Sequence, residues 1–393
     1  MALHAPFAKD NQMKLNKLAI IITCSLIALS GYTVLAKSAT QTPRPAPLDS
    51  TSEPQAASRD WGELVVSESI TTTYVIYSQN FVYGAAPFLI TDLRTDPDHP
   101  GKYSDKESYE TRSLTVYRAH DGQTWLDNQP VVFFVHGGAW IDEYANWYDF
   151  VAQSFTGEKG WITVVIDYRL TSEEVFIADE YCPDRATCNL PENAPLRTKA
   201  AWYPDNIEDV ANAFQWVVDN IASNGGNVDQ IVVFGHSAGG HLASLLATHP
   251  NYAALRPAIK GLISMSGAYS LKELSMITFG SAIDQTWHGG HINNDAELDE
   301  ASPTTYVVPG ITLPPFYLLH AQTELPSLYE QAIAFRVKLE SLGLAVDSAY
   351  LLGYDHVTEM IAIEDINATP TALIVSYIET LLSHRVYLPL ITK

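Results

Sequence analysis

A serine held between two glycines is the first feature of the sequence that could do chemistry. The segment Gly235–Gly239 reads Gly-His-Ser-Ala-Gly, follows the apolar run Ile231–Phe234 and precedes the helix-forming stretch His241–Thr248. A sharp turn from a strand into a helix accepts only small residues beside it, and it raises the serine oxygen above the edge of the sheet. So short a pattern can arise by chance, but the strand before it and the helix after it favour Ser237 as a nucleophile.

A glycine-rich loop supplies the second part of an acyl-transfer site. The loop His136–Trp140 reads His-Gly-Gly-Ala-Trp and directly follows the apolar run Val131–Val135. Attack on a carbonyl group places negative charge on its oxygen, and preorganised backbone amides stabilise that charge. We expect the amides of Gly137, Gly138 and Ala238 to be the donors of this oxyanion hole. A plain glycine-rich turn is the alternative.

His356 occupies the position expected for a general base. Serine is a weak nucleophile until a base takes its proton, and in sites of this kind the chain order is serine, acid, histidine. His356 lies after the last predicted strand and before the last predicted helix. We expect His241 to pack within the helix that follows Ser237, and His320 to be a structural hydrogen-bonding residue at the end of a strand.

Glu324 is the predicted acid of the site. It is the only carboxylate between the apolar run Phe316–Leu319 and the next predicted helix. A carboxylate at this position accepts a hydrogen bond from the imidazole and stabilises its charged form. A solvated loop charge is the alternative for Glu324. Asp355 is a weaker candidate, because the side chains of adjacent residues rarely point at each other.

The elements that must position these residues alternate between apolar runs and helical segments. Several runs are continuously apolar, which suits strands covered on both faces, and alternation of this kind predicts an α/β fold with a mainly parallel central sheet and helices on both faces. The predicted strands are Ser113–Arg118, Pro130–Val135, Trp161–Ile166, Ile231–Phe234, Gly261–Met265, Pro315–Leu319 and Ala345–Leu351, and the clearest helices are Asn206–Ala222, Gly239–Thr248, Ser327–Leu342 and Thr369–Ser383.

The region before these elements is less regular. Ser69–Tyr77 has the β-branched and aromatic content of a strand, whereas Thr91–Arg112, with its Asp, Pro and Lys residues, is typical of an exposed insertion.

The first residues have the pattern of a targeting segment. Lys14 and Lys17 precede the apolar run Leu18–Leu29, and a small-x-small site ends at Ala36. This order predicts a signal peptide over residues 1–36, cleaved near Ala36, and a secreted or periplasmic protein with no stable membrane span after cleavage. An uncleaved anchor is the alternative, although the apolar run is shorter than the ~20 residues that span a bilayer.

The predicted mature chain has two parts. Residues 37–60 are rich in Ser, Thr, Pro and Ala and predict a flexible linker. Residues 61–393 predict one catalytic domain, in which an insertion at about 268–314 forms a small cap. The aromatic residues Trp140, Tyr144, Trp147 and Tyr148 fit either a pocket lining or the core.

Two cysteines lie close together in one loop. In an oxidising compartment Cys182 and Cys188 most simply form a disulfide, with two free thiols as the alternative. A zinc site at these cysteines would need a second pair of ligands, which the sequence does not offer nearby. A metal site at His288 and His291 has no third ligand at a recognisable spacing. We therefore expect no metal and no cofactor.

The composition limits the classes of partner. The chain carries 45 Asp and Glu residues against 23 Lys and Arg residues, and its net charge of −22 argues against nucleic acid and anionic lipid as partners. A 47% hydrophobic content is enough for a sizeable core. A small molecule is the expected partner, and the sequence carries no signal for the oligomeric state.

Four segments together resemble the α/β-hydrolase superfamily in its esterase/lipase branch. They are His136–Trp140, Ile166–Leu170, Gly235–Ala243 and Gly353–His356. This branch includes microbial carboxylesterases and the arylformamidases that hydrolyse N-formylkynurenine, and the resemblance covers about residues 110–385.

The resemblance assigns roles to six residues. It implies Ser237 as nucleophile, His356 as base, Glu324 as acid, and the amides of Gly137, Gly138 and Ala238 as oxyanion donors. The sequence departs from the superfamily pattern twice. Ala139 stands where many relatives have a third glycine, and Glu324 stands where aspartate is commoner.

The resulting hypothesis is a secreted serine carboxylesterase that hydrolyses small-molecule esters through an acyl-enzyme on Ser237. An arylformamidase is the second hypothesis, against which secretion argues. A non-catalytic binding protein on the same scaffold is the third, and such proteins usually lose the serine or the histidine. Acyl and alcohol preference depend on the shape of the pocket rather than on these motifs.

Overall fold

The computed structural model describes residues 62–63, 72–88, 108–141, 143–171, 174–176, 197–199, 203–275 and 295–383. The predicted signal peptide, the predicted linker, the predicted disulfide between Cys182 and Cys188, and the pair His288 and His291 lie outside the described residues. Of the predicted cap insertion, residues 268–275 and 295–314 are described. None of the helices in these ranges is long and apolar enough to cross a membrane.

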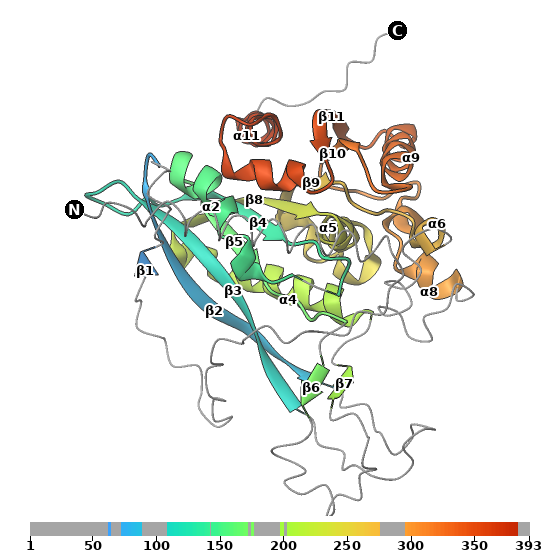
Figure 1. Ribbon diagram of the computed structural model, residues 1–393, viewed down its shortest axis with the longest axis horizontal. Coiled ribbons are helices and arrows are strands. Elements are labelled where there is room, and N and C mark those ends of the chain that lie inside the picture. The colour runs from blue at the N-terminus through green and yellow to red at the C-terminus, as the bar shows by residue number, and fades with distance from the viewer. Residues whose placement is uncertain are drawn as a thin grey trace, which may run out of the picture.

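A nine-stranded sheet is the centre of the described structure, in the order β1-β2-β3-β5-β4-β8-β9-β10-β11 (Figure 1). The six strands from β5 to β11 in this order pair in parallel, and β1, β2 and β3 pair antiparallel. The strands are β1 (Gly62–Glu63), β2 (Val75–Phe88), β3 (Ser108–His120), β4 (Gln129–Val135), β5 (Ile162–Ile166), β8 (Gly226–His236), β9 (Ile259–Met265), β10 (Phe316–Thr323) and β11 (Val346–Asp355), while β6 (Glu174–Phe176) and β7 (Arg197–Lys199) form a separate pair.

Helices cover both faces of this sheet. The described helices are α2 (Phe150–Ala152), α4 (Asp205–Asn220), α5 (Ala238–Thr248), α6 (Leu271–Ser275), α8 (Asp295–Glu300), α9 (Leu328–Ser341), α10 (Thr358–Ile361) and α11 (Thr369–Leu382). Residues of α4, α5 and α9 share one buried apolar cluster with the sheet, and residues of α2, α10 and α11 share another. In Figure 1, α4 and α11 lie on opposite sides of the strands. The prediction of an α/β fold with a mainly parallel sheet is confirmed.

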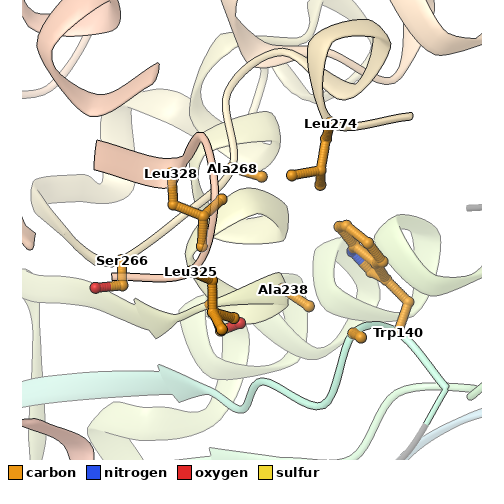
Figure 2. Close-up of a pocket in the computed structure, with 9 residues that line it drawn as sticks. Trp140, Ala238, Ser266, Ala268, Leu274, Leu325 and Leu328 are labelled. Atoms are coloured by element: carbon orange, nitrogen blue, oxygen red, sulfur yellow. The ribbon is translucent and has the colours of Figure 1, made fainter. Parts of the chain in front are cut away.

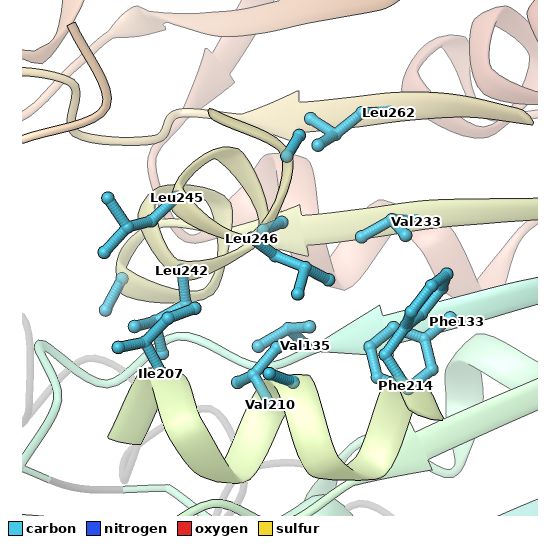
Figure 3. Packing of buried hydrophobic residues seen from close by; sticks show 14 of the residues in the cluster. Phe133, Val135, Ile207, Val210, Phe214, Val233, Leu242, Leu245, Leu246 and Leu262 are labelled. Atoms are coloured by element: carbon cyan, nitrogen blue, oxygen red, sulfur yellow. The ribbon is translucent and has the colours of Figure 1, made fainter. Parts of the chain in front are cut away.

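Apolar side chains from the strands and helices interlock in the first of these clusters. Figure 3 shows Phe214 of α4 against Phe133 of β4, and their ring centroids are 5.3 Å apart at an interplanar angle of 85°. This edge-to-face arrangement suits the aromatic quadrupoles. Both rings are fully buried, so the packing fixes β4, and with it the glycine-rich loop that follows.

The strands β2 and β3 differ from what the sequence predicted for this region. The predicted strand Ser69–Tyr77 shares only Val75–Tyr77 with β2, which continues to Phe88. The proposed exposed insertion Thr91–Arg112 is wrong at its end, because Ser108–Arg112 belongs to β3 and Arg112 is buried. Arg112 forms an ion pair with Asp209 of α4, Nε to Oδ2 at 3.4 Å. A partner almost a hundred residues away leaves no local pattern in the sequence.

Candidate active site

The turn between β8 and α5 gives Ser237 a backbone conformation that few residues adopt. Its φ is 53° and its ψ is −122°. A Cβ atom on Gly235 would stand 2.2 Å from the carbonyl oxygen of Gly239, and one on Gly239 would stand 2.1 Å from the carbonyl oxygen of Val135. Both positions therefore require glycine, and strain of this kind is typical of a residue whose side chain must face a substrate.

Strand register brings the distant parts of the site to one edge of the sheet. His236 of β8 pairs with Met265 of β9, and the amide of Ser237 donates to the carbonyl oxygen of Met265 at 2.9 Å. On the far side, Thr323 of β10 pairs with Asp355 of β11. The residues that follow these parallel strands, Ser237, Glu324 and His356, consequently lie at the same end of the sheet.

Their side chains form a continuous hydrogen-bonded chain. Ser237 Oγ lies 2.9 Å from His356 Nε2, and His356 Nδ1 lies 2.5 Å from Glu324 Oε1. The Glu324 carboxylate accepts a hydrogen bond from His356 Nδ1. The proton is therefore fixed on Nδ1, and Nε2 is left to accept from the serine hydroxyl. The structure thus brings together the three residues predicted as nucleophile, base and acid.

The hydrogen bond between His356 and Glu324 sets the protonation of both groups. Burial alone would lower the pKa of His356, but the charge of Glu324 and its hydrogen bond outweigh burial, and the pKa of the imidazole is raised above 6.5. Burial would raise the pKa of the Glu324 carboxyl, yet His356 and the hydrogen bonds from Ser266 and from the Leu325 amide hold that pKa below 4.5. The resting pair is a carboxylate beside a basic imidazole.

A buried tyrosine holds two carbonyl groups of the glycine-rich loop. The Tyr168 hydroxyl donates to the carbonyl oxygens of His136 and Gly137, at 3.1 Å and 2.7 Å. In a trans peptide the N–H points opposite to the C=O, so the amides of Gly137 and Gly138 face away from Tyr168. Among the described residues no backbone carbonyl accepts from these two amides or from that of Ala238, although the Gly137 amide also interacts with the buried Tyr148 hydroxyl.

Contact with the nucleophile places this loop at the reaction centre. A Cβ atom on Gly137 would meet Ser237 Cβ at 3.2 Å. Gly138 adopts a φ of +85°, which favours glycine. The loop and Ala238 thus supply backbone amides beside one serine, as an oxyanion hole requires.

A small apolar pocket opens beside the serine (Figure 2). It encloses about 280 Å³, part of which is open to solvent, and its described lining is Ala139, Trp140, Ser237, Ala238, Ser266, Ala268, Leu274, Leu325 and Leu328. Figure 2 shows Trp140 and Leu274 on one side and Leu325 and Leu328 on the other. Such a lining fits an uncharged, apolar group bound next to Ser237.

The four aromatic residues that fit either a pocket lining or the core do not all lie in the same place. Trp140 lines the pocket, whereas Tyr148 is buried against Phe134 and His136 and Trp147 packs against the second core cluster. Tyr144 is 44% exposed.

Trp140 is fixed by a histidine of α5. His241 Nδ1 accepts from the indole at 3.1 Å, and its Nε2 donates to the Ala301 carbonyl at 2.7 Å. Burial lowers the pKa of His241 to about 4, so it remains neutral. His241 therefore packs and positions, as expected from the sequence.

The remaining acid and base candidates have other partners. Asp355 Oδ1 accepts from the amides of Val357 and Thr358 at 3.0 Å and 2.8 Å, so its carboxylate closes the first turn of α10. His320 within β10 is buried and its ring contacts those of Tyr329 and Tyr350. Neither contacts Ser237 or the proton-accepting nitrogen of His356 through any interaction found in the described structure.

Two residues of the site, Ser266 and Glu359, were not predicted from the sequence. Ser266 follows β9, has a φ of 48°, and donates a very short hydrogen bond to Glu324 Oε2. Glu359 lies in the first turn of α10, and its side chain is fully buried. Two signals were available: Ser266 follows a parallel strand at the edge that carries the nucleophile, and Glu359 is three residues after His356.

Among the described residues, His236, His356 and Glu359 place potential metal-binding atoms within 4.8 Å of one another. The donor atoms do not fit a metal. Both ring nitrogens of His356 are hydrogen-bonded to Ser237 and Glu324, and His236 Nε2 carries a proton because it donates to the His356 carbonyl at 2.9 Å.

The fold and the site together define a class of protein. The chain has the α/β-hydrolase fold, and the resemblance to the esterase/lipase branch is confirmed by comparison with known proteins. A family model described as BD-FAE matches residues 196–339, which include Ser237 and Glu324. Esterase B from Lactobacillus rhamnosis, solved as a tributyrin phosphonate complex, superposes with a TM-score of 0.54 at 17% identity, over 78% of this chain and 86% of that one. An esterase from Pyrobaculum calidifontis gives a TM-score of 0.51 at 17% identity, over 78% and 85%.

Two curated relatives from Mycobacterium tuberculosis are similar in sequence. The probable carboxylic ester hydrolase LipM is 28% identical over 65% of this chain and 55% of its own length. The esterase LipQ is 28% identical over 56% of this chain and 48% of its own length. The chain thus spans about half the length of these relatives.

Proposed function

We propose that this chain is a carboxylic ester hydrolase that works through an acyl-enzyme on Ser237. The observation that carries the proposal is the hydrogen-bonded chain from Ser237 through His356 to Glu324, at 2.9 Å and 2.5 Å. The names of the relatives as ester hydrolases support it.

The geometry supports the following first half-reaction. Ser237 Oγ attacks the ester carbonyl carbon while His356 Nε2 takes the hydroxyl proton, and Glu324 stabilises the resulting imidazolium. The carbonyl oxygen becomes an oxyanion and accepts from the amides of Gly137, Gly138 and Ala238. The intermediate then breaks its bond to the alcohol oxygen, which takes the proton from His356 and leaves.

The second half-reaction repeats these steps with water. His356 takes a proton from a water molecule as that water attacks the acyl-Ser237 carbonyl. The same amides hold the second oxyanion. Breakage of the bond to Ser237 Oγ releases the carboxylic acid, and the serine regains its proton from His356. The chemistry balances with the residues present and one water molecule.

Substrate turnover tests the proposal against its nearest alternative. We expect the protein to hydrolyse p-nitrophenyl acetate and to leave N-formylkynurenine largely intact. Release of formate from N-formylkynurenine at the greater kcat/KM would replace the esterase by an arylformamidase. If the protein hydrolyses neither compound and no longer p-nitrophenyl ester, the non-catalytic scaffold would be favoured.

Export of the chain is a further part of the proposal. It rests on the basic, apolar and small-residue order of residues 1–36. N-terminal sequencing of the protein recovered from the medium or periplasm should give a chain that starts near Lys37.

The raised pKa of His356 predicts the acid side of the pH profile. The imidazole must be neutral to accept the serine proton, so activity is present above its folded-state pKa and is lost as the pH falls through it. Because that pKa is raised above 6.5, kcat/KM for p-nitrophenyl acetate should decline from a pH higher than 6.5. A profile that stays flat down to pH 5 would show that Glu324 does not act on the imidazole as the structure indicates.

The close approach of Gly137 to the serine predicts the effect of a single methyl group. In Gly137→Ala the new Cβ would stand 3.2 Å from Ser237 Cβ and 3.3 Å from His236 Nδ1. The loop must move by a few tenths of an ångström, and we expect kcat to fall by roughly tenfold or more, because small misplacements of catalytic groups are costly. Gly84→Ala is the matched control, since nothing lies within 4 Å of a Cβ atom there. Equal kinetics for the two variants would remove the Gly137 loop from the oxyanion site.

A further inference from the structure

A second buried carboxyl group lies beside the imidazole of the proposed triad. Glu359 Oε1 is 3.6 Å from His236 Nε2, and one oxygen of Glu359 and one ring nitrogen of each of His236 and His356 lie within 4.8 Å of one another. The Glu359 side chain has no exposed surface, and neither of its oxygens has a hydrogen-bond partner in the described structure. An ionised carboxylate in such a place is costly unless a cation accompanies it.

The groups that face Glu359 come from four neighbouring elements and offer it little positive charge. His236 ends β8, and burial lowers its pKa to about 4, so it is neutral. Ser266 after β9 donates to Glu324, and its hydroxyl also lowers the pKa of Glu359, an effect smaller than that of burial. Glu324 after β10 and Asp355 at the end of β11 are both negative and raise the pKa of Glu359.

His356 is the one group in this set that can become a cation. Glu143, in the loop after β4, adds a further negative charge that acts on both histidines. Burial comes first and the charge of Glu324 second among the causes that raise the pKa of Glu359, to about 8. At neutral pH the Glu324 and Glu359 pair therefore holds one negative charge, on Glu324, and one proton, on Glu359.

We propose that Glu359 is a positioning residue that acts through His356: it carries a proton in the resting site at neutral pH, and on losing that proton it adds a second negative charge that stabilises the imidazolium formed during ester hydrolysis. This inference rests on the proposed esterase function. It does not replace Glu324, whose carboxylate alone contacts His356 Nδ1.

The sign of the effect follows from charge. With Glu359 neutral, only Glu324 and the more distant Glu143 balance the imidazolium of the transition state. With Glu359 ionised, a further carboxylate within about 5 Å favours the imidazolium over the neutral ring. Activity should consequently rise a second time as the pH passes the pKa of Glu359, beyond the first rise that His356 itself produces.

The test is the pH dependence of kcat/KM for p-nitrophenyl acetate in the full-length protein and in Glu359→Gln. We expect two rises in the wild type, the second centred near pH 8 and amounting to roughly threefold to tenfold, the size of a nearby charge effect on a base. Glu359→Gln should keep the first rise and lack the second. Glu364→Gln, five residues later on the same segment and half-buried, is the control and should retain both.

A second variant and a second measurement guard against a loss of folding. Glu359→Met removes the polar group without adding an unpaired amide, and it should also lack the second rise. The carboxyl ¹³C resonance that is missing from the NMR spectrum of Glu359→Gln should titrate near pH 8 in the wild type. This readout does not depend on turnover.

The outcomes separate the two proposals. Superposed wild-type and Glu359→Gln profiles, or a loss by the same factor at every pH, would reduce Glu359 to a packing residue and overturn the inference alone. A carboxyl resonance that titrates near pH 4.5 would also overturn it. A wild-type protein that hydrolyses no ester at any pH would refute the proposed function and, with it, this inference.

Discussion

Ser237→Ala should lower kcat for p-nitrophenyl acetate by roughly 10⁵-fold or more, the scale seen when a serine nucleophile is removed. The variant loses the atom that attacks the ester, while the three amides and the pocket remain. Some rate above that of free water should persist, because an oxyanion hole accelerates attack by water by itself. Steady-state kinetics with circular dichroism as a check on the fold would measure the loss.

Chemical labelling locates the nucleophile independently of turnover. A fluorophosphonate should add one group to the wild type, and peptide mass spectrometry should place it on the peptide that contains Ser237. Ser237→Ala should remain unlabelled, whereas Ser376→Ala, at an exposed position of α11, should behave as the wild type. A label on any other residue would refute Ser237 as the nucleophile.

Residues at the ends of parallel strands could be predicted from the sequence. Ser237 and Glu324 follow strands that contain continuous apolar runs, His356 follows a strand of mixed polarity, and parallel strands bring such ends to one edge. Register then does what sequence order alone cannot: the pairing of Thr323 with Asp355 places Glu324 beside His356. The predicted strands and helices from Ser113 onward fall on observed elements for the same reason, since their burial patterns are local.

Interactions between distant residues could not be predicted in this way. Arg112 is polar and follows a stretch rich in charge, and distant partners such as Asp209, with which it forms an ion pair, accompany its burial. Glu359 resembles any helix-surface glutamate in the sequence. Its burial results from the way α10 folds back over the ends of β8 and β11, a tertiary arrangement with no periodic signature.

The pocket, like the burial of Arg112 and Glu359, depends on residues that are distant in the sequence. Trp140 and Leu325 are far apart in the chain and lie on opposite sides of the pocket, as Figure 2 shows. The motif around Trp140 was visible in the sequence, but the orientation of its indole depends on the hydrogen bond to His241 and on the Thr171 amide, which donates to the Trp140 carbonyl oxygen at 3.0 Å. The motifs therefore predicted the residues of the candidate site, while packing determines what can bind beside them.

Glu324→Gln is the second change with a large expected effect. A glutamine is nearly the same shape but carries no charge, so it cannot stabilise the imidazolium, and its amide can donate toward Nδ1 and favour the wrong tautomer of His356. We expect kcat to fall by roughly 10³- to 10⁴-fold, with KM changed far less, since the pocket is intact.

The pH profile of the same variant gives a signature that a packing defect would not. The charge and hydrogen bond of Glu324 are what raise the pKa of His356 against the opposing effect of burial. Without them burial dominates, so the residual activity of Glu324→Gln should persist to lower pH than that of the wild type. Glu324→Asp, which keeps the charge on a shorter side chain, should recover part of the rate. The pH at which its activity declines on the acid side should also move back toward that of the wild type.

Near-normal activity in Glu324→Gln would mean that another carboxylate supports the base. Asp355 is committed to the first turn of α10 through the amides of Val357 and Thr358, so Glu359 is the remaining acid close to His356. A double variant with Glu324→Gln and Glu359→Gln would then lose the activity that either single variant keeps. If Glu324 is the acid, the double variant should instead be slower than Glu324→Gln alone by a small factor at most, because in the described structure the carboxylate bonded to His356 Nδ1 is that of Glu324.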